Sequence, residues 1–464
     1  MRIAMIGTGY VGLVSGACFS EFGVSVACVD KDADKIARLQ RGELPIYEPG
    51  LDQLVASNAA AGRLTFTTDL KAAVAGADAV FIAVGTPSRR GDGHADLSYV
   101  FAAAGEIAEA LALRPGERAV VVTKSTVPVG TGRRVERILK NILPASRFDI
   151  ASNPEFLREG SAIEDFMRPD RVVIGTDSEH ARGVMRALYR PLYLMETPMV
   201  FTTLETAELI KYAANAFLAT KITFINEVAD LCEAVGADVQ DVAHGIGLDG
   251  RIGRKFLHAG PGFGGSCFPK DCQALIRSAE MAESPLSIVE TVLRANDARK
   301  RRMARRIVAA CGGDVAGLTI AALGLTFKPN TDDMRDSPSL AILPALHEAG
   351  ARVRAFDPEG VEEAKKLMPE LDYCADAYEA MEGADALVLI TEWNEFRGLD
   401  LARVKALLRR PLVIDLRNIY KPDEMAAAGL AYHSIGRPPA SQSVSDPPGE
   451  EPAAGKPGHL RVIA

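Results

Sequence analysis

A cysteine in a glycine-rich loop is the residue of this chain best suited to covalent chemistry. Cys267 lies in the run Gly262-Phe-Gly-Gly-Ser-Cys-Phe-Pro-Lys-Asp271, so glycines precede the thiol and a lysine and an acid follow it. Glycine has no Cβ, which would let a substrate approach this backbone closely. A thiol beside a cation ionises more readily and becomes a nucleophile. Most unpaired cysteines are buried and inert, but the neighbours of Cys267 are poor core material, so we predict a reactive thiol.

A second motif with chemical meaning opens the chain. Gly7-Thr-Gly-Tyr-Val-Gly12 directly follows the apolar run Arg2–Ile6, and Asp30 ends the next predicted strand. This spacing is typical of a dinucleotide-binding turn, in which Gly7 allows the turn, Gly9 admits the pyrophosphate and Gly12 packs helix against strand. Asp30 would accept hydrogen bonds from the adenosine ribose and repel a 2′-phosphate, which favours NAD over NADP. A nicotinamide and a nucleophilic thiol together suggest oxidation through a covalent carbonyl adduct.

Two threonines follow other predicted strands and could lie beside such a cofactor. Thr86 follows the apolar run at 79–84, and Thr126 follows the run at 119–123. Loops that leave the carboxyl ends of strands in an open sheet line the ligand crevice. Each threonine could equally be a turn or cap residue.

Size, charge and cysteine usage exclude several classes of protein. With 464 residues the chain is too long for one ordinary core, and its net charge of -8 argues against nonspecific nucleic-acid binding. The seven cysteines are scattered, and Cys267 and Cys272 have no companion histidines, so we expect neither a disulfide framework nor a metal site. No apolar run reaches the ~18 residues that a membrane span needs. The first predicted strand begins at Arg2, directly after Met1, so we expect a cytoplasmic protein without a signal peptide.

Alternating strand-like and helix-like runs must position these residues. They fill residues 1 to about 196 and return from Leu318, which predicts an α/β fold with two Rossmann-like, doubly wound parallel sheets. Residues 204–235 contain no proline or glycine and predict a central helix about 45 Å long, buried between domains or against another subunit. The predicted strands are Arg2–Ile6, Val24–Val29, Leu64–Thr67, Ala79–Val84, Ala119–Thr123, Asp149–Ala151, Arg171–Ile174, Thr319–Leu323, Arg352–Phe356, Ala386–Ile390 and Leu412–Ile414.

Four segments follow from this pattern. We expect an NAD-binding Rossmann domain at 1–196, a central helical domain with the cysteine loop at 197–296, and a second α/β domain at 297–436. Residues 437–464 are rich in proline, glycine, serine and acids, so we expect a disordered tail.

Several motifs, in this order, resemble the UDP-glucose/GDP-mannose dehydrogenase family. They are Gly7–Gly12, Asn153–Gly160, Lys211–Asn215, the stretch from Arg251 through Asp271, and Phe327–Arg335. The likeness covers roughly residues 1–435. It implies conversion of UDP-glucose to UDP-glucuronate with two NAD+. It also implies a homodimer or higher homo-oligomer, because Arg251 looks like the sugar contact that the family donates from a neighbouring subunit.

The resemblance implies roles for individual residues. Cys267 would be the nucleophile, with Lys211, Asn215 and Asp271 around the reacting carbon and Glu155 and Thr126 assisting as catalytic residues. The implied cofactor contacts are Gly7, Gly9, Val11, Gly12, Asp30, Lys35, Thr86, Thr126, Glu159, Lys270 and Arg335. The implied substrate contacts are Glu155, Phe156, Leu157, Arg158, Lys211, Asn215, Arg251, Phe256, Leu257, His258, Ala259, Gly260, Gly264, Lys328 and Arg417.

These residue types suit a four-electron oxidation. A thiolate can trap the intermediate aldehyde as a thiohemiacetal, which loses a second hydride to give a thioester that water cleaves. We expect Lys211 to stabilise the oxyanion with help from Asn215, which lies on the same helix face. Asp271 would orient the attacking water or hold Lys211, and it could also cap a helix at 272–281. Lys328 and Arg417 would meet the diphosphate from the second α/β domain.

Three other interpretations stay open. The same chemistry could act on GDP-mannose or UDP-N-acetylmannosamine, although relatives of the latter kind resemble a loop with histidine at the position of Ser266. A one-step hydroxyacid dehydrogenase would need neither the thiol nor the second α/β domain. A non-catalytic, NAD-responsive binding protein would predict a broken site, whereas Cys267, Lys211, Asn215 and Asp271 are all present.

Overall fold

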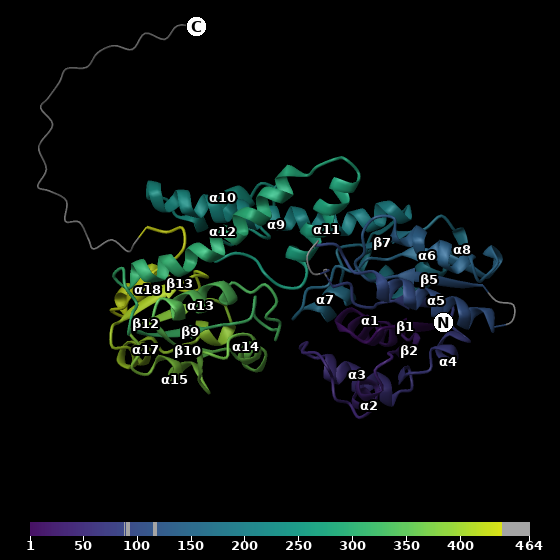
Figure 1. Cartoon of the computed structure of the whole chain (residues 1–464), viewed down its shortest axis with the longest axis horizontal. Helices are drawn as coiled ribbons and strands as arrows, with labels where there is room; N and C mark the ends of the chain where they lie inside the picture. Colours follow the sequence, from purple (N-terminus) through teal and green to yellow (C-terminus); the bar gives the residue numbers. More distant parts are fainter. Residues whose placement is uncertain (88, 90–92, 115–117, 439–464) are drawn as a thin grey trace, which may run out of the picture.

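The computed structural model describes residues 1–87, 89, 93–114 and 118–438. Within them two α/β units are joined by long helices, which run across the top of Figure 1 over both sheets. Of the tail predicted at 437–464, residues 439–464 lie outside the described part. Among the described helices, none combines the length and the apolar character needed to cross a bilayer.

The first sheet is doubly wound around its central strand. Its order is β3-β2-β1-β4-β5-β6-β7-β8, so the chain switches sides of β1 between β3 and β4. The strands are β1 (Arg2–Ile6), β2 (Ser25–Val29), β3 (Leu64–Thr67), β4 (Ala79–Ile82), β5 (Ala119–Thr123), β6 (Phe148–Ser152), β7 (Val172–Gly175) and β8 (Met199–Thr202). Every pair is parallel except β6 and β7, which meet antiparallel through Ser152 and Gly175, a departure from the predicted all-parallel sheet.

Helices cover both faces of this sheet, which is why its strands are nearly continuous apolar runs. β5 is buried at every position, and along β1 the side chains alternate between two core clusters, Ile3 and Met5 in one and Ala4 and Ile6 in the other. The flanking helices are α1 (Tyr10–Glu21), α2 (Ala33–Gln40), α3 (Leu51–Ala60), α4 (Leu70–Val74), α5 (Ser98–Ala112), α6 (Thr131–Lys140), α7 (Ala162–Met167) and α8 (Glu179–Leu188).

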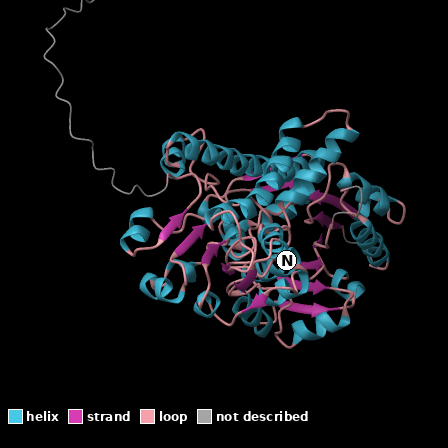
Figure 2. Cartoon of the chain, turned by 60° about the vertical axis from the view of Figure 1, so that its left-hand side comes forward, coloured by secondary structure: helices cyan, strands magenta, loops and turns pink. Residues whose placement is uncertain are grey.

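The second sheet repeats this architecture with parallel strands alone. Its order is β11-β10-β9-β12-β13-β14, and Figure 2 shows the strands of the chain as two sets flanked by helices. The strands are β9 (Thr319–Leu323), β10 (Arg352–Phe356), β11 (Asp372–Tyr373), β12 (Ala386–Leu389), β13 (Leu412–Asp415) and β14 (Ala431–His433). The helices are α13 (Ser339–Glu348), α14 (Val361–Leu367), α15 (Ala377–Met381), α16 (Asn394–Arg397), α17 (Leu401–Leu407) and α18 (Pro422–Ala427).

Three strands were not predicted, and all three lie at sheet edges. β8, β11 and β14 are two to four residues long and mix exposed or half-buried positions with few buried ones. Such short and partly exposed segments give a weaker signal than the longer, buried apolar runs on which strand prediction depends.

Four helices join the two sheets. They are α9 (Leu204–Val235), α10 (Val239–Gly247), α11 (Phe268–Met281) and α12 (Ser287–Ala310), and α9 confirms the predicted central helix. α11 begins four residues before the predicted start at Cys272, because Pro269 lies in its first turn, where its fixed φ suits a helix start. Asp271 is therefore a residue of the first turn, and the prediction that it caps this helix is wrong.

Candidate active site

The predicted catalytic side chains meet where the first sheet contacts α9 and α11. Lys211 on α9 donates a hydrogen bond from Nζ to Oε1 of Glu155, which follows β6, at 3.0 Å. Thr126, after β5, donates to the same carboxylate from 3.4 Å. One turn along α9, Asn215 Nδ2 donates to Asp271 Oδ2 on α11 at 2.6 Å. The structure thus brings these residues into two adjoining hydrogen-bonded groups.

Glu155 and Lys211 are a buried ion pair, each about 5% exposed or less at the side chain. Burial works against both charges. The pKa of Glu155 is nevertheless lowered, since Lys211 and the Leu157 amide stabilise the carboxylate. The pKa of Lys211 is likewise raised by the nearby charges of Glu155, Cys267 and Asp271. Both groups are therefore ionised at neutral pH, so that the Glu155 carboxylate is a base that lies beside the Lys211 cation.

Cys267 occupies the N-cap position of α11. The positive end of a helix dipole stabilises a thiolate, as does the Lys211 ammonium. Burial acts more strongly and raises the pKa of the thiol, and the carboxylates of Glu155 and Asp271 raise it further. The resting side chain is therefore a protonated thiol, which differs from the ready ionisation expected from the sequence.

The glycines before Cys267 serve a close contact with the second α/β unit. A Cβ on Gly264 would lie 2.2 Å from the carbonyl oxygen of Asp336, and one on Gly265 would lie 2.6 Å from the ring of Phe327. The Gly265 amide also donates to the Arg335 carbonyl at 2.7 Å. These glycines therefore let the loop pack against 327–336, a close contact that the sequence did not predict.

Buried polar side chains that the sequence analysis missed hold the start of this loop. Asn296 on α12 pairs with both backbone groups of Phe263, at 2.8 and 3.0 Å. Asn226 on α9 accepts from the Gly260 amide at 2.8 Å, and Arg299 donates to the Gly260 carbonyl at 2.6 Å. Polar residues within helical runs gave no sequence signal for this role.

The glycine-rich turn after β1 fits a dinucleotide. Gly7 has φ of +105°, and a Cβ there would lie 2.6 Å from the Ala83 carbonyl oxygen. A Cβ on Gly12 would lie 2.0 Å from the Gly7 carbonyl oxygen. The Cβ position of Gly9 has no atom within 4 Å, which leaves the space that a pyrophosphate needs at the start of α1.

Asp30 anchors this turn as well as presenting an acid at the end of β2. Its Oδ2 accepts from the Thr8 amide at 3.0 Å, from the Thr8 hydroxyl at 2.6 Å and from Lys35 Nζ at 3.0 Å. Burial opposes its charge, but these hydrogen bonds outweigh burial and lower the pKa of Asp30 to about 2. Asp30 and Lys35 therefore lie together, as predicted for one cofactor site.

The other predicted cofactor residues lie in different surroundings. Thr86 donates to the Thr126 carbonyl at 3.0 Å and so ties two strand-end loops together, and Val11 lies in the first turn of α1. Glu159 pairs with Arg335 of the second α/β unit at 3.3 Å. Lys270 pairs with Asp271 at 2.9 Å and so belongs to the cysteine cluster.

A cavity of about 320 Å³ opens beside the predicted substrate segment. Leu257, His258, Ala259 and Arg417 line it, together with α10 and the unpredicted Arg254. Arg417 is held in place by Glu392 at 3.0 Å and by the carbonyls of Ile390 at 2.7 Å and Phe327 at 3.1 Å. Its Nη1 lies 3.2 Å from the Cβ position of Gly260. Two arginines at one cavity suit a diphosphate.

The remaining predicted substrate residues vary in how close they come to this cluster. Lys328 follows Phe327. Burial lowers its pKa, and the charges of Glu159 and Cys267 offset this only in part, so Lys328 lies on the cysteine side. The ring of Phe156 lies 5.3 Å from Lys211 Nζ. The Leu157 amide donates a hydrogen bond to the Glu155 carboxylate at 2.6 Å. Arg158 forms an ion pair with Asp165 at 2.7 Å. Phe256 has a left-handed backbone, with φ of +64°.

Arg251 lies on the surface of the chain. Its side chain is 89% exposed and pairs with Asp249 at 2.5 Å. Within one chain it contacts none of the other predicted site residues among those described.

Lys124, at the end of β5, is a buried cation that the sequence analysis left without a role. Its Nζ contacts Asn153 Oδ1 at 3.2 Å and the Tyr189 hydroxyl at 3.3 Å. Burial lowers the pKa of Lys124 to about 8, while Glu155 raises it. In return, Lys124 helps to keep the Glu155 carboxylate ionised. Its position at the carboxyl end of a strand was the available signal.

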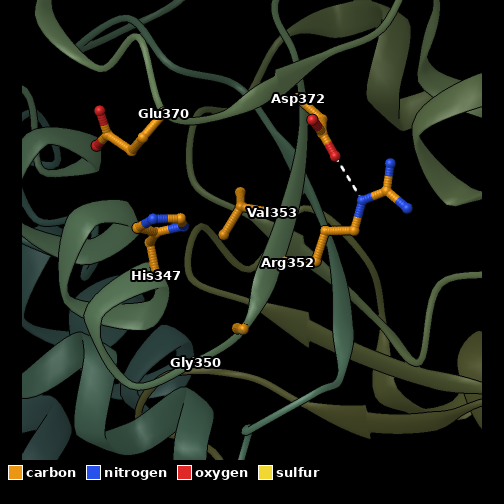
Figure 3. A pocket seen from close by; sticks show the side chains of 7 residues that line it. His347, Gly350, Arg352, Val353, Glu370 and Asp372 are labelled. Carbon is orange, nitrogen blue, oxygen red and sulfur yellow. Dashed lines mark hydrogen bonds and ion pairs between the residues drawn. The ribbon is translucent and has the colours of Figure 1, made fainter.

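A second hollow, of about 370 Å³, lies away from these residues. Figure 3 shows His347, Val353 and Glu370 around it, with Arg352 paired to Asp372 at 2.5 Å. It lies at the β10–β11 edge of the second sheet and includes no predicted site residue.

Comparisons with known proteins show which family the chain resembles. The UDP-glucose/GDP-mannose dehydrogenase family matches in three parts, its NAD binding domain at residues 1–193, its central domain at 205–298 and its UDP binding domain at 321–422. The UDP-glucose 6-dehydrogenase of Rhizobium meliloti strain 1021 is 66% identical over 94% of this chain and 100% of its own length. That of Bacillus subtilis strain 168 is 51% identical over 94% and 93%.

A solved structure agrees with these matches in three dimensions. The UDP-glucose dehydrogenase of the hyperthermophilic archaeon Pyrobaculum islandicum superposes with a TM-score of 0.85 at 39% identity, covering 94% of this chain and 98% of that one. The chain therefore belongs to the UDP-glucose/GDP-mannose dehydrogenase family and is an NAD-dependent dehydrogenase.

Proposed function

We propose that this protein oxidises UDP-glucose at C6 to UDP-glucuronate in two successive hydride transfers, with covalent capture of the intermediate by Cys267. One observation carries the proposal. A thiol at the N-cap of α11 adjoins both the Lys211–Glu155 ion pair and the Asn215–Asp271 hydrogen bond. An alcohol dehydrogenase that stopped at the carbonyl would need only the base and the cation.

In the first oxidation the ion pair performs the proton chemistry. Glu155 is ionised and accepts the hydroxyl proton, directly or through water, while Lys211 stabilises the negative charge that develops on oxygen. Thr126 fixes the Glu155 carboxylate from the β5 loop. NAD+, when bound, supplies the hydride acceptor for both oxidations, and the turn at Gly7–Gly12 with Asp30 would hold its dinucleotide.

In the second stage Cys267 keeps the aldehyde on the protein. The sulfur bonds to the carbonyl carbon, and Lys211 with Asn215 stabilises the resulting oxyanion. Loss of the second hydride leaves a thioester, which water cleaves to the acid. Asp271 accepts from Asn215 and Lys270 and is 1% exposed, so it holds these two donors in position.

The second α/β unit supplies the contacts for the nucleotide diphosphate. Arg417 is held rigidly at the cavity beside Leu257–Ala259, and Lys328 lies on the adjoining loop. An arginine held by two carbonyl acceptors and one ion pair loses little conformational entropy when it binds a phosphate. The site therefore lies between the two α/β units, and their approach excludes water from the thioester.

We further propose that the enzyme is at least a dimer and acts in the cytoplasm. α9 exposes Phe217, Phe224 and Leu231, which are 54–66% exposed and seven residues apart, so they form one apolar stripe. A second copy that covers this stripe would bring the exposed Arg251 of one chain toward the site of the other. A reducing compartment keeps the Cys267 thiol available.

Replacing Cys267 by serine tests the covalent step. The variant should release about one NADH per active site in a rapid phase and then stall. The reason is that an aldehyde bound to the serine oxygen proceeds to the acid less readily than one bound to sulfur, which passes through a thioester. Stopped-flow absorbance at 340 nm measures this. Cys272→Ala, five residues along α11 and in the core, is the matched control and should complete both oxidations. Complete two-step turnover by Cys267→Ser would remove the thiol from the mechanism.

A further inference from the structure

The thiol that this mechanism needs is protonated at rest, so its proton must have an acceptor. The carboxylate of Glu155 already accepts hydrogen bonds from Lys211, Thr126 and the Leu157 amide. Asp271 accepts from Asn215 and Lys270. Among the described residues, one side-chain polar atom lies within hydrogen-bonding distance of the sulfur, the hydroxyl oxygen of Ser266 at 3.5 Å.

Ser266 connects the sulfur to a second carboxylate. Its hydroxyl donates to Glu159 Oε1 at 3.1 Å, which leaves the hydroxyl oxygen free to accept from the thiol. The three groups therefore form a directional chain, S–H to Oγ and Oγ–H to Oε1. Each donor in this chain has one acceptor ahead of it, as a proton relay requires.

Glu159 has the surroundings of a base that can hold a proton. Its side chain is 11% exposed, and its Oε2 is buried without a hydrogen-bond donor in the part of the chain that the structure describes. Burial, and after it the nearby carboxylate of Asp333, raises the pKa of Glu159 to about 7. Arg335 and Lys328 oppose this shift. A base with this pKa is matched to neutral pH.

We propose that the Ser266 hydroxyl relays the proton of Cys267 to the carboxylate of Glu159, so that Glu159 is the terminal proton acceptor when the sulfur attacks. This inference rests on the proposed function and adds a base to it. The S–H bond breaks as an Oγ–H bond forms, and the original Oγ–H proton passes to Oε1. The sulfur bonds to the carbonyl carbon as the carbon–oxygen π bond breaks, and that electron pair becomes the oxyanion that Lys211 stabilises. One thiol, one aldehyde and one carboxylate thus become one thiohemiacetal oxyanion and one carboxylic acid.

The relay also explains why the base is assembled from both α/β units. Glu159 follows β6, whereas Asp333 and Arg335 belong to the second unit, and Arg335 pairs with both acids, at 3.3 Å to Glu159 and 2.7 Å to Asp333. The Gly265 amide beside Ser266 donates to the Arg335 carbonyl. Separation of the units would remove Asp333 from Glu159 and so change its basicity, which links thiol activation to the closed arrangement.

Variants of Ser266 and Glu159 separate the relay from a structural role. In stopped-flow reactions with UDP-glucose and NAD+, Ser266→Ala and Glu159→Gln should keep the first NADH phase and slow the second by about 100-fold, a common loss for a missing base. Ser266→Thr keeps the hydroxyl and should restore the second phase. KM for UDP-glucose should stay within about twofold in both variants, because the relay acts on a proton and not on binding of the sugar nucleotide.

The pH dependence gives a readout that a packing role would not move. The rate of the second phase in the wild type should rise through pH 7 as Glu159 ionises and becomes able to accept, and Glu159→Gln should lose this rise. Equal slowing of both phases, or full activity of Ser266→Ala, would overturn the relay.

A substrate-free experiment keeps the relay separate from the proposed function. Alkylation of Cys267 by iodoacetamide, followed by mass spectrometry of its peptide, should show an inflection near pH 7 from Glu159 in addition to that of the thiol. The Glu159→Gln variant should lose this inflection. The other charged groups near the sulfur are the same in the wild type and the variant; they are Lys211, Glu155 and Asp271. If the wild type lacks the inflection, the relay is wrong. If the inflection is present but UDP-glucose yields no NADH, the proposed function is wrong.

Discussion

Cys267 owes its place in the mechanism to its immediate neighbours. The N-cap position and Lys211 favour the thiolate, whereas burial and two nearby carboxylates favour the thiol. The loop sequence indicated Lys270 as the cation beside the thiol, whereas Lys270 pairs with Asp271 and the cation that favours the thiolate is Lys211 of α9, which only the family resemblance had suggested. The sequence could not predict which influence is stronger, because that depends on how deeply the sulfur lies among residues far apart in the chain.

The glycines beside it show the same limit. Gly264 and Gly265 were predicted to open the backbone to a substrate, but the atoms that require glycine there belong to Asp336 and Phe327, more than sixty residues later. A glycine-rich run indicates a close approach without saying what approaches. The glycines at Gly7–Gly12 were easier to interpret, since the strand and helix that they join are adjacent in sequence.

At the residue scale, Asp30→Asn tests the cofactor site. The pKa of about 2 keeps this carboxylate ionised at neutral pH. Its contribution to stability is present above the unfolded pKa near 3.8 and is lost as pH falls toward 2. Removing the charge weakens the ribose contacts and loosens Thr8 in the turn. The Kd for NAD+ should rise about tenfold or more. Isothermal titration measures it, with Asp34→Asn in the first turn of α2 as the exposed control.

Unchanged affinity in Asp30→Asn would show that Asp30 serves only the fold of the turn. The affinity for UDP-glucose should not change in either variant, because Asp30 follows β2 of the first sheet, whereas Arg417 follows β13 of the second.

At the element scale, α9 has two faces with separate tasks. Its inner face buries Lys211 and Asn215 at 3 and 7% exposure, and its outer face presents Phe217, Phe224 and Leu231. Length, absence of helix breakers and apolar content on both sides predicted this helix from the sequence. The edge strands β8, β11 and β14 were missed because they are short and only partly buried.

The outer face of α9 carries the prediction on assembly. Phe217→Ser with Phe224→Ser should turn the oligomer into monomers in analytical ultracentrifugation, since exposed aromatic pairs of this kind dominate helix interfaces. NAD+ binding should persist, and kcat/KM should fall by about tenfold or more, because Arg251 no longer reaches a neighbouring site. Leu367→Ser on α14, an equally exposed apolar position, should change neither property. A wild type that sediments as a monomer would contradict the shared site.

At the scale of the whole molecule, the proposed site combines residues from three parts of the chain. The first sheet contributes Thr126 and Glu155, the central helices contribute Lys211, Asn215 and Cys267, and the second sheet contributes Lys328 and Arg417. The order and kind of these parts could be predicted because strand–helix alternation is a repeated local signal. The contacts between them, such as Glu159 with Arg335, join residues 176 positions apart and have no local signature.

The number of NADH molecules formed per UDP-glucose tests the central claim most directly. With limiting UDP-glucose and excess NAD+, the wild-type enzyme run to completion should form two NADH per sugar, because Cys267 holds the aldehyde until the second oxidation. Absorbance at 340 nm gives NADH, and chromatography of the nucleotide sugars gives UDP-glucuronate. One NADH per sugar, with free aldehyde in solution, would contradict covalent capture by Cys267.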